Sequence, residues 1–105
     1  MDERKMQELS EKILVYLLEN QTTLESYEAP DKLTTTSMAR RLKENPNRLS
    51  ILLNKLVQKR LVHSEEHFVV GYSTKKEVYS LTPYGISKAK SMISQKKDEK
   101  ESNNN

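Results

Sequence analysis

The sequence predicts a mainly α domain with one small β-hairpin, which is an α+β fold class, and three observations predict it. Two stretches of apolar residues at helical spacing stand on either side of a proline within residues 34–60. Two segments rich in strand-forming residues follow, 62–70 and 76–82. Longer helical patterns precede and follow this central part. The 105 residues are enough for one small domain, which we place at residues 1–95, with a disordered polar tail at 96–105.

The composition argues against several classes of protein. Hydrophobic residues make up 34% of the chain and charged residues 31%, so the core is thin, and thin cores often gain stability from oligomerisation. There is no cysteine for a disulfide or a thiolate metal site. No apolar run approaches the roughly 20 residues that span a bilayer, and no signal peptide follows Met1. We therefore expect a soluble, cytoplasmic protein.

The first predicted element is an amphipathic helix over residues 3–20. Its main apolar stripe consists of Met6, Leu9, Ile13 and Leu17. Residues 13–18 are six apolar residues in a row, and a helix apolar over that much of its circumference buries more than one face. A second copy of the chain is the simplest cover for the second face, so we predict a homodimer through the Met6–Leu18 helix and the C-terminal helix. The alternative is a helix buried deep in its own domain.

A polar connector, residues 21–32, leads into a pair of short helices, and residues 32–34 can form a short strand before them. Thr35 or Thr36 can cap the first helix of the pair, because a hydroxyl accepts from the free N–H groups of a first turn. Pro46 ends that helix, since the residue before a proline is disfavoured in the α region. The apolar face of this helix consists of Met38, Ala39 and Leu42.

The second helix of the pair spans residues 47–59 and can be capped by Asn47. Its core-facing stripe consists of Leu49, Leu52, Leu53, Leu56 and Val57. Its opposite face consists of Arg48, Ser50, Ile51, Asn54, Lys55 and Gln58. This face mixes cations that bind phosphates with side chains that can contact base edges. An exposed Ile51 could contact a thymine methyl group or pack against the hairpin.

Charge separates the helix pair from the rest of the chain. Residues 36–60 contain seven Lys and Arg residues against one Glu, a net charge of +6, whereas residues 1–31 contain three against eight acids, a net charge of −5. The overall net charge of +3 hides this asymmetry. A basic block on a helix pair suits the binding of DNA phosphates. The alternative is that the basic side chains only form a solvated face.

The two strand segments form a hairpin, and Gly71 supplies the positive φ that its turn needs. A hairpin directly after the second helix of a basic pair is a wing. Lys75 and Lys76 at its tip can contact phosphates or the minor groove, or can simply keep the tip soluble. The last helix begins with Thr82 as N-cap and Pro83 at the first helical position. Its apolar face consists of Ile86, Ala89 and Ile93.

This pattern resembles the winged helix-turn-helix DNA-binding proteins, and within them the MarR-like group of small prokaryotic and archaeal transcriptional regulators. The resemblance covers residues 33–93 and depends on the order and spacing of several short motifs. The matching stretches are Leu33-Thr34, Met38 to Leu42, Leu49 to Leu56, Lys59 to Val62, and Tyr79 to Gly85. The resemblance implies a winged helix-turn-helix fold and double-stranded DNA as a partner.

The chain departs from the family pattern in three ways. Arg60 stands where the family usually has a glycine in the left-handed conformation, so either Arg60 adopts that conformation or the helix ends differently. Residues 71–76 replace the family's Asp-Arg-Arg run, so the arginine that would enter the minor groove is absent or replaced by lysine. The chain is also shorter than many members. We therefore expect no dedicated pocket for a small-molecule effector between the dimer helices.

Catalytic arrangements are not evident in the sequence. His63 and His67 lie on one side of a strand, but four residues at about 3.3 Å each place them roughly 13 Å apart, too far for one metal ion. Glu65 and Glu66 are adjacent and point to opposite sides of the strand. Glycine occurs only at positions 71 and 85, so there is no phosphate-cradling loop. We expect neither an enzyme nor a cofactor or metal site.

The sequence therefore predicts a sequence-specific, double-stranded DNA-binding transcriptional regulator that acts as a homodimer, with helix 47–59 in the major groove and wing 70–76 on the backbone or in the minor groove. The predicted base-reading residues are Arg48, Ser50, Ile51 and Asn54. The predicted phosphate-binding residues are Thr36, Arg40, Arg41, Lys55, Lys75 and Lys76, and Asn47 completes the DNA-binding set. One alternative is a winged-helix module that binds another protein through its acidic first helix and the apolar excess of that helix. The other is a non-specific architectural DNA binder.

Overall fold

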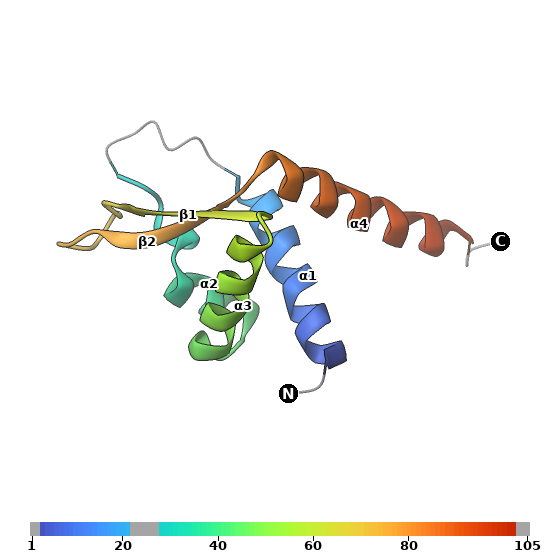
Figure 1. The fold of residues 1–105 in the computed structure, drawn as a ribbon, viewed down its shortest axis with the longest axis horizontal. Coiled ribbons are helices and arrows are strands. Elements are labelled where there is room, and N and C mark those ends of the chain that lie inside the picture. Colours follow the sequence, from blue (N-terminus) through green and yellow to red (C-terminus); the bar gives the residue numbers. More distant parts are fainter. Residues whose placement is uncertain (1–2, 22–27, 103–105) are drawn as a thin grey trace.

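The computed structural model describes residues 3–21 and 28–102, with side chains to residue 95 (Figure 1). The elements are α1 (Glu3–Glu19), a 3-10 turn η1 (Asp31–Leu33), α2 (Thr35–Leu42), α3 (Pro46–Gln58), β1 (Val62–His67), β2 (Lys76–Leu81) and α4 (Pro83–Ser102). The prediction of a mainly α domain with one small β-hairpin is confirmed. None of the helices in this described part combines the length and the apolar character needed to cross a membrane.

Helix α1 is buried within its own chain. Its buried side chains are Leu9, Ile13, Leu14, Tyr16 and Leu17. They are covered by α4, α3 and β2, all of which contact α1. Burying a leucine or isoleucine contributes about 1.5–3 kcal/mol to stability, so α1 is a main source of core energy. The alternative of a helix deep in its own domain is therefore correct, and the apolar excess of α1 is no argument for a partner.

The short strand predicted at residues 32–34 is replaced by η1. Thr34 makes only an isolated antiparallel bridge to Val78, and Ala29 makes an isolated parallel bridge to Val69. Tyr16 connects α1 to η1, because its hydroxyl donates a 2.6 Å hydrogen bond to the Lys32 carbonyl. Residues 22–27, half of the predicted connector, lie outside the described residues.

The N-cap of α2 is Thr34, one residue before the predicted Thr35 or Thr36. Its hydroxyl accepts from Ser37 N at 3.3 Å and donates to Asp31 O at 2.8 Å. One side chain therefore caps both the end of η1 and the start of α2. Thr34 is also buried, which excludes water from this helix start.

Pro46 and Asn47 have other roles in the turn between α2 and α3 than the predicted ones. Helix α2 ends at Leu42 because Lys43 adopts the left-handed conformation, with φ of 58°. Pro46 does not end α2; it is the first residue of α3, where its missing N–H costs nothing. Asn45, and not Asn47, is the N-cap of α3, and its side-chain oxygen accepts from Asn47 N at 2.8 Å and from Arg48 N at 3.3 Å.

Helix α3 ends at Gln58 through a left-handed residue. Arg60 takes φ of 64°, the conformation usually left to glycine. Arg60 N bonds to Val57 O at 3.0 Å and Leu61 N to Leu56 O at 3.0 Å, which is the Schellman pattern of helix termination. Of the two possibilities for Arg60, the left-handed conformation is the one found.

The wing is a two-stranded antiparallel hairpin whose register runs from Val62 opposite Leu81 to His67 opposite Lys76. The predicted strands, 62–70 and 76–82, are therefore too long. The first strand ends at His67 because the next residues turn toward Ala29, which pairs with Val69.

Helix α4 begins as predicted, with Thr82 as its cap: the Thr82 hydroxyl accepts from Gly85 N at 2.9 Å. The helix packs against α1 near its start and then projects from the body of the domain (Figure 1). It runs on to Ser102, through residues assigned to a polar tail. The disorder of residues 96–105 stays a prediction.

Candidate nucleic-acid interface

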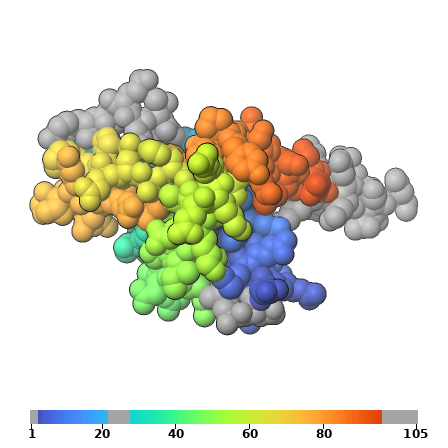
Figure 2. Space-filling view, viewed as in Figure 1, coloured from blue at the N-terminus to red at the C-terminus, as the bar shows by residue number. Residues whose placement is uncertain are grey.

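The outer face of α3 consists of Asn47, Ile51, Asn54 and Gln58. These residues are separated by four, three and four positions, so they share one side of the helix, opposite the buried leucines. All four are exposed, and the Ile51 side chain, at 56% exposure, is a large hydrophobic residue open to solvent. Figure 2 shows α3 as a ridge between the hairpin and α1. The face thus offers three amides and one apolar side chain.

Two predicted base-reading residues lie beside this face. Ser50 is half-buried on its edge. Arg48 is exposed, but it lines a shallow hollow together with Lys5, Glu8 and Lys12 of α1. The prediction missed Gln58 as a site residue, although the same helical spacing that placed Ile51 and Asn54 would have included it.

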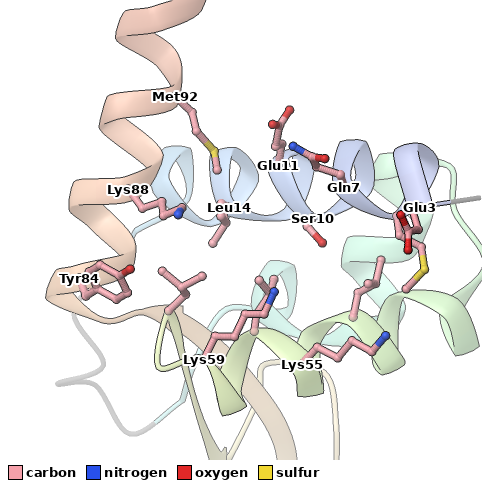
Figure 3. A pocket seen from close by; sticks show the side chains of 14 residues that line it. Glu3, Gln7, Ser10, Glu11, Leu14, Lys55, Lys59, Tyr84, Lys88 and Met92 are labelled. Atoms are coloured by element: carbon pink, nitrogen blue, oxygen red, sulfur yellow. The ribbon is translucent and has the colours of Figure 1, made fainter.

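A larger groove is lined by residues of α1, α3 and α4 and has a volume of about 780 Å³ (Figure 3). Lys55 and Lys59 reach into it from α3 and its C-terminal end, and Lys88 reaches in from α4, whereas α1 contributes Glu3 and Glu11. The apolar residues lining the groove are Met6, Leu14, Leu52, Leu56, Leu61 and Met92. Lys55, a predicted phosphate-binding residue, therefore lies on the α1 side of α3. The expectation that no effector pocket exists stays a prediction.

The three predicted residues of α2 are divided between two surroundings. Thr36 and Arg40 are exposed. Arg40 lies 3.9 Å from the Asp31 carboxylate, yet its side chain remains 70% exposed, so this ion pair leaves the guanidinium accessible. Arg41 is exposed as well, but it lies against α1, beside Tyr16 and Glu19. Burial raises the pKa of Tyr16, and the positive charge of Arg41 opposes that rise.

The wing tip, defined as residues 68–76, carries the predicted Lys75 and Lys76, and both are exposed. Each ammonium group lies over an aromatic ring. Lys75 Nζ is 5.2 Å from the centroid of Phe68, and Lys76 Nζ is 5.3 Å from that of Tyr72. The sequence reading did not include these rings. The spacing of Tyr72 and Lys76, and the position of Phe68 across the hairpin from Lys75, were the available signals.

The two histidines have separate surroundings. His63 Nε2 lies 3.5 Å from the Glu65 carboxylate, and His67 Nδ1 lies 2.8 Å from Phe68 O. Within residues 3–21 and 28–102, no three His, Cys, Asp or Glu side chains are grouped so that they could hold a metal ion.

Comparison with known proteins gives a structural likeness without a sequence match. No family model matches the chain, and no curated protein is significantly similar in sequence. A double mutant of Lactococcus lactis ZitR in apo form matches with a TM-score of 0.69 and 21% identity, over 96% of this chain and 66% of that chain. Staphylococcus aureus MepR, in a complex with DNA, matches with a TM-score of 0.67 and 22% identity, over 94% and 67%.

A transcriptional regulator homologue from Pyrococcus horikoshii OT3 matches with a TM-score of 0.65 and 19% identity, over 90% of this chain and 82% of that chain. The chain spans about two thirds of the length of the ZitR and MepR chains. Likeness at this level of identity concerns the arrangement of the elements. The protein thus has the winged helix-turn-helix fold of MarR-like transcriptional regulators.

Proposed function

We propose that the protein is a sequence-specific transcriptional regulator that binds double-stranded DNA as a homodimer, with α3 in the major groove. The observation that carries this proposal is the outer face of α3, where Asn47, Asn54 and Gln58 surround an exposed Ile51. A face of this composition suits base edges, because it combines directional hydrogen-bonding groups with one apolar contact. The solved complex of MepR with DNA, which has a similar fold, supports the assignment.

The chemistry of this face favours adenine and thymine. An amide side chain can donate and accept at once, which matches the N6 and N7 groups of adenine in the major groove. An exposed isoleucine matches the thymine methyl group. We therefore expect a half-site in which A·T pairs face Asn54 and Ile51.

The cations around the outer face would supply phosphate contacts. Arg40 on α2 and the two lysines of the wing tip are exposed and belong to elements that flank α3 in sequence. Arg48 and Lys55 lie on the α1 side of α3, so we expect them to contact backbone rather than bases. Arg41, placed against Tyr16, contributes least in this arrangement.

Helix α4 supports a homodimer. It projects from the domain and carries two large exposed hydrophobic side chains, Tyr84 at 58% and Ile93 at 39% exposure. A two-fold dimer would place two α3 helices about one helical turn of DNA apart, ~34 Å, on a near-palindromic site.

The test is selection of duplexes from a random pool, followed by fluorescence anisotropy titration across a salt series. We expect the selected duplex to bind more tightly than a random one, and the logarithm of the binding constant to fall linearly with the logarithm of salt concentration. Asn54→Ala should cost about 1–3 kcal/mol on the selected duplex and little on the random one. Gln95→Ala, an exposed amide on α4, serves as the control.

Absence of binding at low salt, or a response that does not depend on salt, would contradict the proposal. Equal binding of selected and random duplexes would favour the architectural alternative. The protein-interaction alternative depended on an apolar excess of α1, and the structure buries that excess within the chain.

A further inference from the structure

The wing tip holds both of its lysines in defined positions. Each ammonium group lies within about 6 Å of a ring centroid, the range in which the negative face of the ring attracts a cation. Lysine carries its ammonium group on a flexible four-carbon stem, so this group is normally free to sample many positions. Two consecutive lysines, each placed over its own ring, are therefore restrained before any ligand arrives.

The first pair follows from the register of the hairpin. The last paired residues are His67 and Lys76, so Phe68 and Lys75 are the next residues toward the tip, and the Lys75 ammonium group lies 5.2 Å from the centroid of the Phe68 ring. Side chains directly opposite each other on an antiparallel pair are close enough to interact. The ring of Phe68 is therefore brought to Lys75 by the strands themselves.

The backbone that carries Phe68 is tied to the body of the domain. Phe68 O accepts a 2.7 Å hydrogen bond from Ala29 N, and Val70 N donates a 3.0 Å hydrogen bond to Ala29 O. Val69, between them, is buried at 1% exposure. The base of the wing tip is thus fixed by two hydrogen bonds and one core side chain.

The second pair depends on the same anchor. Tyr72 N donates to Val69 O at 3.1 Å, and Gly71 supplies the turn with φ of +92°. This turn starts from an anchored residue and sets the position of the Tyr72 ring, which is 40% exposed and lies under Lys76 Nζ.

We propose that Phe68 and Tyr72 are positioning residues that hold Lys75 and Lys76 ready to bind two phosphates of the DNA backbone. This inference rests on the proposed DNA-binding function. A restrained lysine loses less rotamer freedom on binding than a free one, so the rings raise affinity without touching DNA. The ammonium group keeps donors on the side away from the ring, where a phosphate can approach. The wing tip would then act on the backbone and not through an inserted arginine.

The first test concerns the free protein and needs no DNA. In proton NMR spectra, the Lys76 ε-methylene protons should be shifted upfield by the Tyr72 ring. Tyr72→Leu, which keeps an apolar side chain but removes the ring, should abolish that shift, and Tyr72→Phe should keep it. Equal Lys76 shifts in the native protein and in Tyr72→Leu would overturn the inference.

The second test measures binding of a selected duplex across a salt series. Lys76→Gln should reduce the slope of the binding constant against salt by about one. Tyr72→Leu should weaken binding about two- to fivefold with the slope unchanged, because the pair is a weak exposed contact, whereas Tyr72→Phe should bind as the native protein does. In the Lys76→Gln background, Tyr72→Leu should have no further effect.

The outcomes separate the two proposals. If the native protein binds no duplex, both the proposed function and the phosphate contact are wrong. If it binds duplex while Tyr72→Leu and Tyr72→Phe bind equally well, only the positioning role is wrong. A loss from Tyr72→Leu that persists in the Lys76→Gln background would also contradict positioning, since the ring would then act independently of that lysine.

Discussion

Thr82 and Gly85 tie the start of α4 to the end of α3. Thr82 N donates to Leu61 O at 3.1 Å, and the Thr82 hydroxyl donates to Arg60 O at 2.7 Å. The backbone of α4 then passes so close to the Leu61 carbonyl that a Cβ on Gly85 would collide with it. Only glycine fits at this position without a shift of the backbone.

We predict that Gly85→Ala destabilises the protein by about 1–3 kcal/mol, as overpacking of a close contact does. The direction of the change in the free energy of unfolding tests the contact, because Gly→Ala at an unobstructed helical position stabilises by about 1 kcal/mol. Urea unfolding followed by circular dichroism gives the free energy. Ser87→Ala, at an exposed position of the same helix, is the control and should be neutral or slightly stabilising. A Gly85→Ala variant as stable as the native protein would show that the contact is not restrictive.

Single residues were only partly predictable. The cap of α4 was identified correctly because Thr82-Pro83 leaves one suitable candidate. The caps of α2 and α3 were assigned wrongly because several neighbouring side chains could serve, and the sequence does not say which takes the extended conformation. In the structure these caps are Thr34 and Asn45.

At the scale of elements, two buried tyrosines join helices and strand to their neighbours. Tyr16 of α1 donates to the Lys32 carbonyl, and Tyr79 of β2 is buried at 2% exposure. Burial raises the pKa of both phenols above the ordinary value of about 10. The folded state therefore holds these two protons more tightly than the unfolded chain does.

We predict that the free energy of unfolding decreases above about pH 10, because the contribution of these two tyrosines is lost there. This contribution is fully present below the unfolded pKa of about 10 and is lost as pH rises through the higher folded values. Urea unfolding at a series of pH values from about 8 to 11 measures it. A Tyr16→Phe, Tyr79→Phe double variant should be less stable at pH 8 but should lose less stability with rising pH. An identical pH dependence in both proteins would contradict the assignment.

Which side of each element is buried could be predicted, but not how elements pack on one another. The leucine stripe of α3 was identified from helical spacing. That Arg48 and Lys55 face α1 could not be, because it depends on where α1 lies relative to α3. The first strand was predicted too long, because Phe68, Val69 and Val70 satisfy a strand pattern. In the structure the backbone of this segment pairs with Ala29 instead.

At the scale of the whole molecule, α1 belongs to the body and α4 leaves it. The fold class was predictable because helical and strand periodicities follow one another in a simple order. Burial of α1 was the harder inference, because the sequence does not show how much depth the other elements give the core. In the structure, contacts from α3, α4 and β2 together supply that depth.

We predict that the protein is a dimer at micromolar concentration and that α4 forms part of the interface. Ile93→Glu would place a charge where two copies meet, so the mass of this variant in solution should fall toward that of one chain. Light scattering after size exclusion measures this mass. Ser91→Glu, an exposed polar position on α4, is the control for added charge. A native protein with the mass of one chain would contradict the prediction.

The shared carbonyl of Leu61 has a mechanical consequence. Because it receives the Thr82 amide and abuts Gly85, α4 cannot tilt without moving the residues that terminate α3. In a dimer joined through α4, the angle between α3 and α4 would set the distance between the α3 helices of the two copies. The contact of Leu61 with Thr82 and Gly85, away from the DNA, would then determine the spacing between the two half-sites of a target duplex.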